Sequence, residues 1–140
     1  MAGVPGLTFL ALCLPFLGAL IAPVIVRRLG HNAAWLLALL PAFAFLHFAG
    51  FLPDIASGQV AEGGFDWVPS LGLRFSWLLD GLSLTFALLI TGIGTLIILY
   101  SGGYLKGHAD LGRFFSFIFL FMGSMLGLVV ADSFLTLFVF

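Results

Sequence analysis

Long, almost uncharged runs alternate with short polar segments along this chain, and their lengths predict membrane helices. The runs cover residues 7–26, 33–52, 78–100 and 114–131, and a further apolar run occupies residues 133–140. At a rise of about 1.5 Å per residue, about twenty helical residues cross the hydrocarbon core of a bilayer, which is roughly 30 Å thick. We therefore predict an all-α integral membrane protein with four transmembrane helices and the incomplete start of a fifth.

Small side chains recur at helical spacing in two of these runs and predict faces for helix packing. The third run carries them four residues apart, at Ser83, Ala87, Thr91 and Thr95. The fourth run contains a GxxxG pair, Gly123 and Gly127. Small residues at such spacing let a neighbouring membrane helix approach closely.

The connection between the second and third runs has a different periodicity. Residues 71–77 place apolar side chains at every second position, which is typical of a half-buried strand. Residues 65–68 could form a partner strand, and Pro69 with Ser70 could form the turn, because proline presets the dihedral angle that a β-turn needs. We predict a short extracellular β-hairpin between helices two and three, at the membrane surface.

Composition supports the membrane class and excludes several others. Hydrophobic residues make up 62% of the 140 residues and charged residues only 8%, whereas soluble domains carry about 25% charged residues. The net charge of −1 offers no basic surface for nucleic acid. Cys13 is the single cysteine, so no internal disulfide can form.

Basic residues predict the orientation of the chain. Arg27 and Arg28 lie in the first connection, and Lys106 and Arg113 lie in the third. The second connection holds three acidic residues against Arg74 alone. Basic loops remain in the cytoplasm, so the N-terminus and the predicted hairpin are expected outside.

Three ionisable residues near the apolar runs are candidates for an ion pathway: Asp80, Asp132 and His47. Each carboxylate lies at the outer end of a predicted helix, near its start, so it could cap that helix or collect H⁺ or a cation at the outer mouth of a pathway. His47 lies within a run, where it could move protons or remain a neutral packing residue. The three histidines fall in different segments without metal-ligand spacing. No catalytic constellation is present either, so we expect a protein that is not an enzyme and has no cofactor.

Two stretches carry a family resemblance. WVPSLGLRFSWLLDGLSLTFALLITGIGTLIILYS (67–101) and LGRFFSFIFLFMGSMLGLVVADSFLTLFVF (111–140) resemble the large A subunit of Mrp-type multisubunit Na⁺/H⁺ antiporters. That protein is related to the antiporter-like subunits of respiratory complex I. The resemblance implies an external N-terminus, a hairpin after helix two and many further helices. It also implies that residues 1–140 are the N-terminal fragment of one antiporter-like domain and that its pathway glutamate would follow Phe140.

The resemblance also implies a function. Such a complex exchanges external H⁺ for internal Na⁺, driven by the proton motive force, and so serves pH and Na⁺ homeostasis. Its expected partners are the other subunits of a hetero-oligomeric complex in a bacterial cell (inner) membrane, together with the lipid bilayer. Two alternatives remain: a proton-pumping subunit of a complex I-type NADH dehydrogenase, and a structural scaffold that conducts nothing.

Overall fold

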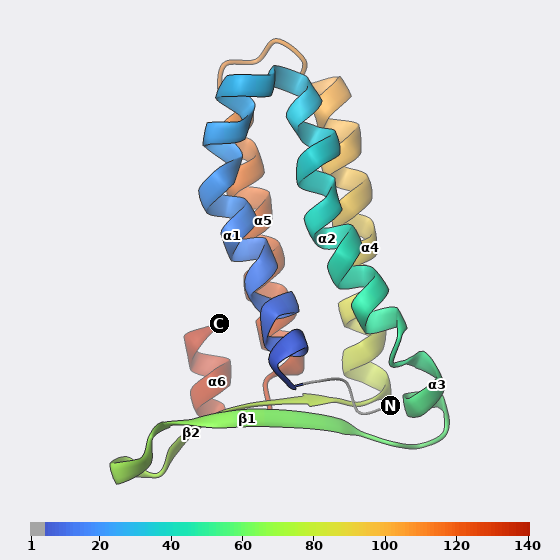
Figure 1. Cartoon of the computed structure of the whole chain (residues 1–140), viewed down its shortest axis with the longest axis vertical. Coiled ribbons are helices and arrows are strands. Elements are labelled where there is room, and N and C mark those ends of the chain that lie inside the picture. Colours follow the sequence, from blue (N-terminus) through green and yellow to red (C-terminus); the bar gives the residue numbers. More distant parts are fainter. Residues whose placement is uncertain (1–4) are drawn as a thin grey trace.

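Four long helices stand side by side in the computed structural model, which describes residues 5–140, and a β-hairpin crosses one end of them (Figure 1). These helices are α1 (Pro5–Leu29), α2 (Ala33–Ala49), α4 (Gly81–Tyr104) and α5 (Leu111–Val130). Among the described residues, three stretches are long and apolar enough to cross a membrane. The first of them, Gly6–Ala56, contains both α1 and α2. The chain reverses between these two helices at the short 3-10 helix η1 (Gly30–Asn32).

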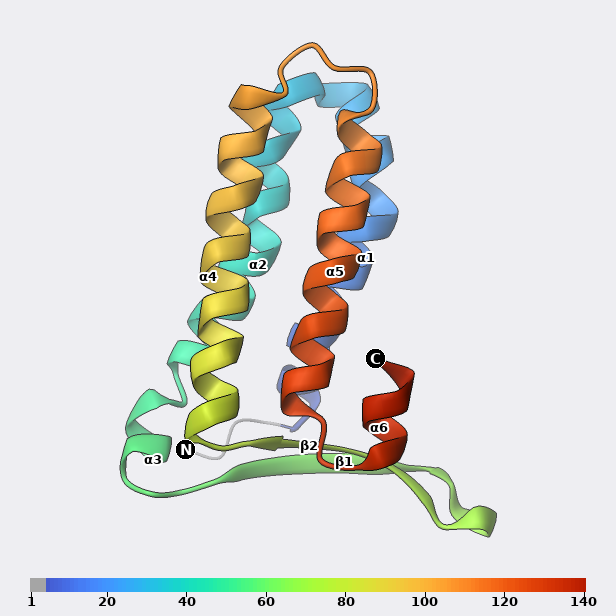
Figure 2. The same ribbon diagram turned by 180° about the vertical axis from the view of Figure 1, so that it is seen from behind.

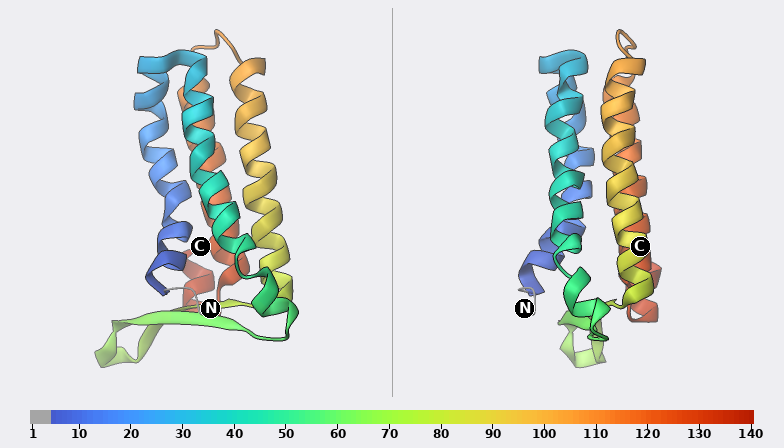
Figure 3. Two further views of the ribbon diagram at one scale, coloured as in Figure 1. Left: turned by 45° about the vertical axis from the view of Figure 1, so that its right-hand side comes forward. Right: turned by 90° about the vertical axis from the view of Figure 1, so that its right-hand side faces the viewer.

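The helices form a square. Helix α1 packs against α2 and α5, and α4 packs against the same two helices from the opposite corner. The view from behind shows α4 and α5 in front of α2 and α1 (Figure 2). A side view separates the α1–α2 layer from the α4–α5 layer (Figure 3). Every helix therefore has one face inside the bundle and one outside it.

A two-stranded antiparallel hairpin lies between α2 and α4, as predicted, but its strands differ in extent from the predicted ranges 65–68 and 71–77. Strand β1 (Ala61–Val68) pairs antiparallel with β2 (Leu73–Leu79), and Phe65 lies opposite Phe75. The turn consists of the 3-10 segment η2 (Pro69–Leu71) and Gly72, whose φ of +66° lies in the left-handed region that favours glycine. Alternate residues of β2 point into the end of the bundle, as period two requires.

The third helix starts later than the sequence predicts. Residue 78 was its expected start, but Leu78 and Leu79 pair with Glu62 and Ala61 as the last residues of β2. Helix α4 begins only at Gly81. Both segments are apolar here, so hydrophobicity alone does not show where the strand ends.

The other helix ends differ from prediction by a few residues. Helix α1 continues to Leu29, and its last turn contains the two arginines expected to follow it. Helix α2 ends at Ala49, and a separate short helix, α3 (Leu52–Ala56), follows. Helix α5 begins at Leu111 rather than at residue 114.

The last apolar run contains the short helix α6 (Phe134–Val139). The expected external N-terminus concerns residues 1–4, which lie outside the described part of the chain. We call the end of the bundle that carries β1, β2, α3 and α6 the hairpin end. The end that carries η1 and residues 105–110 is the connection end.

Two buried clusters fill the bundle. The cluster at the hairpin end is rich in aromatic rings and includes Phe48, Phe51, Phe75 and Trp77. The other cluster extends to the connection end and is rich in alanine, with Phe115 and Phe119 among its larger members. The hairpin is thus part of the core of this protein and closes one end of the bundle.

Candidate functional site

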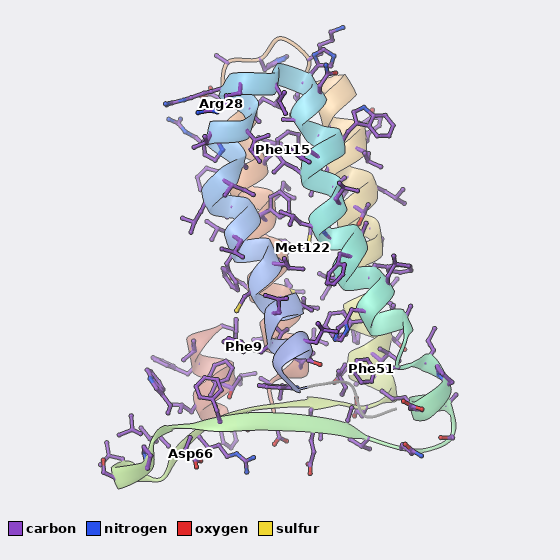
Figure 4. The ribbon with its side chains drawn as sticks, viewed as in Figure 1. Phe9, Arg28, Phe51, Asp66, Phe115 and Met122 are labelled. Carbon is purple, nitrogen blue, oxygen red and sulfur yellow. The ribbon has the colours of Figure 1, made fainter. Side chains whose placement is uncertain are left out.

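Charged side chains are confined to the two ends of the molecule. The connection end has four basic residues and one acidic residue: Arg27, Arg28, Lys106, Arg113 and Asp110. The hairpin end has one basic residue and five acidic residues: Arg74, Asp54, Glu62, Asp66, Asp80 and Asp132. Figure 4 shows Arg28 reaching outward at one end and Asp66 on the hairpin at the other. A charge is costly in hydrocarbon, so this separation suits helices that cross a bilayer.

Asp80 is the N-cap of α4. Its backbone is extended, and its Oδ1 accepts a hydrogen bond from the backbone N–H of Ser83 at 2.7 Å. Hydrogen bonds from Ser83, chiefly from its backbone, lower the pKa of the Asp80 carboxyl. The carboxylate therefore satisfies one free N–H of the helix start and interacts favourably with the helix dipole.

Asp132 does not cap the helix that follows it. Ser133 has that role, because its Oγ accepts a hydrogen bond from the backbone N–H of Thr136 at 3.2 Å. The backbone N–H of Asp132 donates to the carbonyl of Ser76 at 3.3 Å, and the Asp132 side chain is exposed. Within residues 5–140, no ion pair involves Asp80 or Asp132.

His47 has a partner that the sequence did not reveal. Its Nε2 lies 3.2 Å from the hydroxyl of Thr8 on α1, a side chain that is 3% exposed. The imidazole also meets the rings of Phe48 and Phe51 edge-on. Thr8 is the single hydroxyl residue of the first apolar run, which is a signal that could have identified it. Its pairing with a residue 39 positions away required the tertiary structure.

The free edge of β2 is covered by residues 131–136, which we call the edge clamp. Trp77 forms an isolated β-bridge with Ala131. The backbone N–H of Ser76 donates to Thr136 Oγ1 at 3.2 Å, and its carbonyl accepts from Asp132. The Thr136 side chain is 1% exposed, so the clamp is an internal contact. A strand edge otherwise leaves a row of unpaired backbone groups, so the clamp fixes the hairpin to the end of α5.

The small residues predicted to form a packing face on α4 make most of their side-chain hydrogen bonds within that helix. Ala87 is fully buried, and Thr91 and Thr95 each donate to the carbonyl four residues earlier at 2.7 Å. Only Ser83 connects two helices, because its hydroxyl donates to the carbonyl of Val129 on α5 at 3.0 Å. These hydroxyls therefore place no unsatisfied polar group inside the bundle.

The two glycines of the GxxxG pair receive aromatic rings. A Cβ atom built at Gly123 would lie 2.9 Å from the ring of Phe16 on α1. At Gly127 it would overlap the ring of Phe140. Both glycines are buried, so the space that each leaves is filled by a side chain from another element.

The described residues offer little for chemistry or metal binding. Residues 5–140 contain no group of three or more His, Cys, Asp or Glu side chains that could hold a metal ion. The buried polar side chains in this range are all hydroxyls: Thr8, Thr91, Ser101 and Thr136. The candidate ion-pathway residues thus lie at the hairpin end, half-buried or exposed, and have no charged partner within residues 5–140.

The proteins of known sequence that this chain resembles include A-type subunits of Na⁺/H⁺ antiporters. The chain is 39% identical over 135 residues to the A1 subunit of the Na⁺/H⁺ antiporter of Staphylococcus haemolyticus, which covers 96% of this chain and 17% of that relative. It is 45% identical over 130 residues to the A subunit of the Na⁺/H⁺ antiporter of Alkalihalophilus pseudofirmus, which covers 90% of this chain and 16% of the relative. The family model described as NADH-Ubiquinone oxidoreductase (complex I), chain 5 N-terminus, matches residues 67–115.

A solved structure agrees with these relatives. The structure of the Mrp complex from Dietzia sp. DQ12-45-1b superimposes with a TM-score of 0.78 at 33% sequence identity. It covers 94% of this chain and 14% of the matched chain. The resemblance predicted from residues 67–101 and 111–140 is confirmed. Together with the apolar helices, these relatives identify a multi-pass membrane protein.

Proposed function

We propose that this chain, which resembles the A subunits of Na⁺/H⁺ antiporters over nearly its whole length, forms an N-terminal membrane part of a multisubunit cation/proton antiporter. The similarity over 96% of the chain is the observation that supports this proposal most strongly. The chain spans 17% of that relative, so the activity, ions and partner subunits of the whole complex are part of the proposal.

In this proposal all four long helices cross the membrane. The four basic residues of the connection end favour a cytoplasmic position for it, and the acidic hairpin end then faces outward. The long helices have 17 to 25 residues, and α2 is the shortest of them. These lengths agree with the roughly 20 residues that a bilayer requires.

The proposed reaction exchanges external H⁺ for internal Na⁺ and uses the proton motive force. A proton arriving from outside would meet the acidic hairpin end, where Asp80 and Asp132 lie. His47 and Thr8 form the next polar pair toward the bundle interior. A proton relay through a membrane needs buried ionisable groups, and we propose that the rest of a longer polypeptide and its partners supply most of them.

Proteoliposomes that contain the purified complex test this function directly. A pH gradient is imposed, Na⁺ is added, and the change in internal pH is followed with a fluorescent dye. We expect Na⁺-dependent dissipation of the gradient. If intact complexes give the same trace with and without Na⁺, the antiport proposal is wrong.

Three neutral variants then test the candidate pathway: Asp80→Asn, Asp132→Asn and His47→Gln. Asp66→Asn is the matched control, because Asp66 is an exposed hairpin carboxylate. A pathway residue should lower the Na⁺-dependent rate in complexes that assemble normally. If all three assembled variants transport like the control, this part of the chain is a scaffold. The satisfied hydroxyls inside the bundle favour that scaffold role as the second candidate.

A complex I-type proton pump is the other candidate, supported by the family match at residues 67–115. Such a subunit would copurify with flavin and iron–sulfur proteins, and NADH would drive proton movement. Adding NADH to inverted membrane vesicles separates the two functions. The antiporter proposal expects transport that depends on Na⁺ and is indifferent to NADH.

A further inference from the structure

We propose that the connection end binds the phosphate headgroup of an anionic phospholipid in a cleft between α1 and α5. The cleft has a volume of about 590 Å³. Its lining comes from the end of α1 with η1 and from the start of α5 with the loop before it. The two segments are far apart in sequence and meet only in the folded bundle.

Two arginines and two histidines supply hydrogen-bond donors to the cleft. Arg27 and His31 line it from one side, and His108 and Arg113 line it from the other. Guanidinium groups suit phosphate because their planar N–H groups can bind two oxygens at once. The lining contains a single carboxylate, Asp110, which lies 3.7 Å from Arg113 in an exposed ion pair. An exposed pair of this length is weak, so phosphate can compete for Arg113.

The two helices that line the cleft are in direct contact with each other. Ser116 lines the cleft, and its hydroxyl donates to the carbonyl of Ala19 on α1 at 2.7 Å. Gly112 allows close approach, because a Cβ atom there would lie 3.0 Å from Pro23 Cα. These contacts fix α1 and α5 relative to each other, and each helix carries one of the two arginines. Asp110 is the N-cap residue of α5, but its side chain makes no capping hydrogen bond to the first N–H groups of that helix.

Each arginine continues an exposed apolar helix face, and this feature favours a lipid over a free anion. On α1, Leu20 and Val24 precede Arg27 at helical spacing and are 75% and 55% exposed. On α5, Phe117 and Leu120 follow Arg113 after four and seven residues and are 63% and 43% exposed. Because α1 and α5 are packed neighbours, an amphipathic ligand could place its phosphate in the cleft and its acyl chains along this surface.

Exposed tryptophan and tyrosine side chains also lie near the connection end of the bundle. Trp35 near the start of α2 is exposed, and Tyr100 and Tyr104 stack on each other at the end of α4. Tryptophan and tyrosine collect at the headgroup region of bilayers. The cleft thus lies at the depth where a phospholipid presents its phosphate.

Native mass spectrometry of the purified complex tests the site with two probes, dioleoyl-phosphatidylglycerol and dioleoyl-phosphatidylcholine. The double variant R27Q/R113Q removes the two cleft arginines. The control R28Q/K106Q removes the same charge from the same end, at residues that do not line the cleft. We expect R27Q/R113Q to weaken phosphatidylglycerol binding by about tenfold or more, and the control to change it by less than about twofold. Phosphatidylcholine should bind more weakly than phosphatidylglycerol to the unaltered complex.

Three results would overturn the proposal. Equal losses in both double variants would mean diffuse attraction to a basic surface. Equal binding of the two lipids would mean that the headgroup charge is not read. Displacement of phosphatidylglycerol by inorganic phosphate at equal concentration would mean a free-anion site.

A second variant, R27K/R113K, keeps the charge and serves if the glutamine variant fails to assemble. Lysine lacks the planar pair of N–H groups that binds two phosphate oxygens, so phosphatidylglycerol should bind this variant more weakly than it binds the unaltered complex. Unchanged binding would mean that the two guanidinium groups do not hold the phosphate.

Discussion

At the hairpin end, Phe48, Phe51, Phe75 and Trp77 fill the bundle, whereas the cluster that extends to the connection end is rich in alanine beside Phe115 and Phe119. The contrast is clearest at Gly102, where an added Cβ atom would overlap the Cβ of Ala34 on α2. Large rings can fill a space between diverse elements, but they need those elements to hold them. Small residues let two helices touch directly, and so they fix the distance between those helices.

The two ends also differ in how they satisfy backbone polar groups. A strand that lies across the end of a helix bundle has one edge without a partner. The edge clamp supplies that partner through Ala131, Asp132 and Thr136. The connection end has short links between neighbouring helices, and the ion pair of Asp110 with Arg113 there is exposed. The hairpin end is thus held by specific bonds, and the connection end by close contact.

Removing the Trp77 ring at the hairpin end should lower the stability of the protein more than the other substitutions considered below. Trp77 is 5% exposed, and Trp77→Ala should lower the free energy of unfolding by about 3–5 kcal/mol. Trp67 on β1 is 55% exposed, so Trp67→Ala is the control and should cost far less. Unfolding of the purified protein in mixed micelles measures both. Equal effects would mean that the hairpin does not close the bundle.

Adding one carbon atom tests the close contact at the connection end. Gly102→Ala should destabilise the protein by about 1–3 kcal/mol, because Ala34 Cβ is fixed to its backbone and cannot swing away. Gly103→Ala is the matched control, since nothing lies within 4 Å of an added Cβ there. The control should be neutral or slightly stabilising, because alanine favours helix more than glycine. The same unfolding titration reports both variants, and a neutral Gly102→Ala would contradict the contact.

The edge clamp should contribute less than either packing term. Thr136→Val removes the hydroxyl that accepts from Ser76, and leaving that N–H unpaired should cost about 1–2 kcal/mol. Amide hydrogen exchange at Ser76 should become faster. Thr85→Val is the control, because the Thr85 hydroxyl is exposed and bonds only to the carbonyl of Gly81. Unchanged exchange at Ser76 would mean that the clamp does not hold β2.

The Asp80 cap should have the smallest effect, and that effect should depend on pH. The pKa of Asp80 is lowered by its bonds from Ser83, so the ionised cap stabilises the fold above the ordinary aspartate pKa of about 3.9. This stability is lost as the pH falls through the lowered pKa. Asp80→Asn keeps an acceptor but removes the charge. The variant and the unaltered protein should therefore differ in free energy of unfolding, and in amide exchange at Ser83, by an amount that shrinks on acidification. Asp132→Asn, which removes a carboxylate that caps no helix, should show no such trend in amide exchange at Ser83.

The sequence predicted the elements well where one periodicity acts alone. The apolar runs predicted the long helices, and the alternation over residues 71–77 predicted β2, which begins at Leu73. Residues 65–68 were predicted as the partner strand and form the second half of β1. Prediction failed at the junction of Leu79 and Asp80, where strand and helix are both apolar. It also offered Asp132 as a helix cap, whereas the cap is the next residue, Ser133. Such ends depend on which backbone group finds a partner, and that partner lies in another element.

The candidate site shows the same limit more strongly. Sequence periodicity and charge by themselves determined the membrane class, the hairpin and the separation of basic from acidic ends, because these depend on local hydrophobicity and chain order. Only the tertiary structure decided that His47 meets Thr8, that Ser76 is held by Thr136, and that Arg27 and Arg113 share one cleft. Each of these contacts joins residues from different elements. Their partners are chosen by how the helices pack, and no local pattern records that choice.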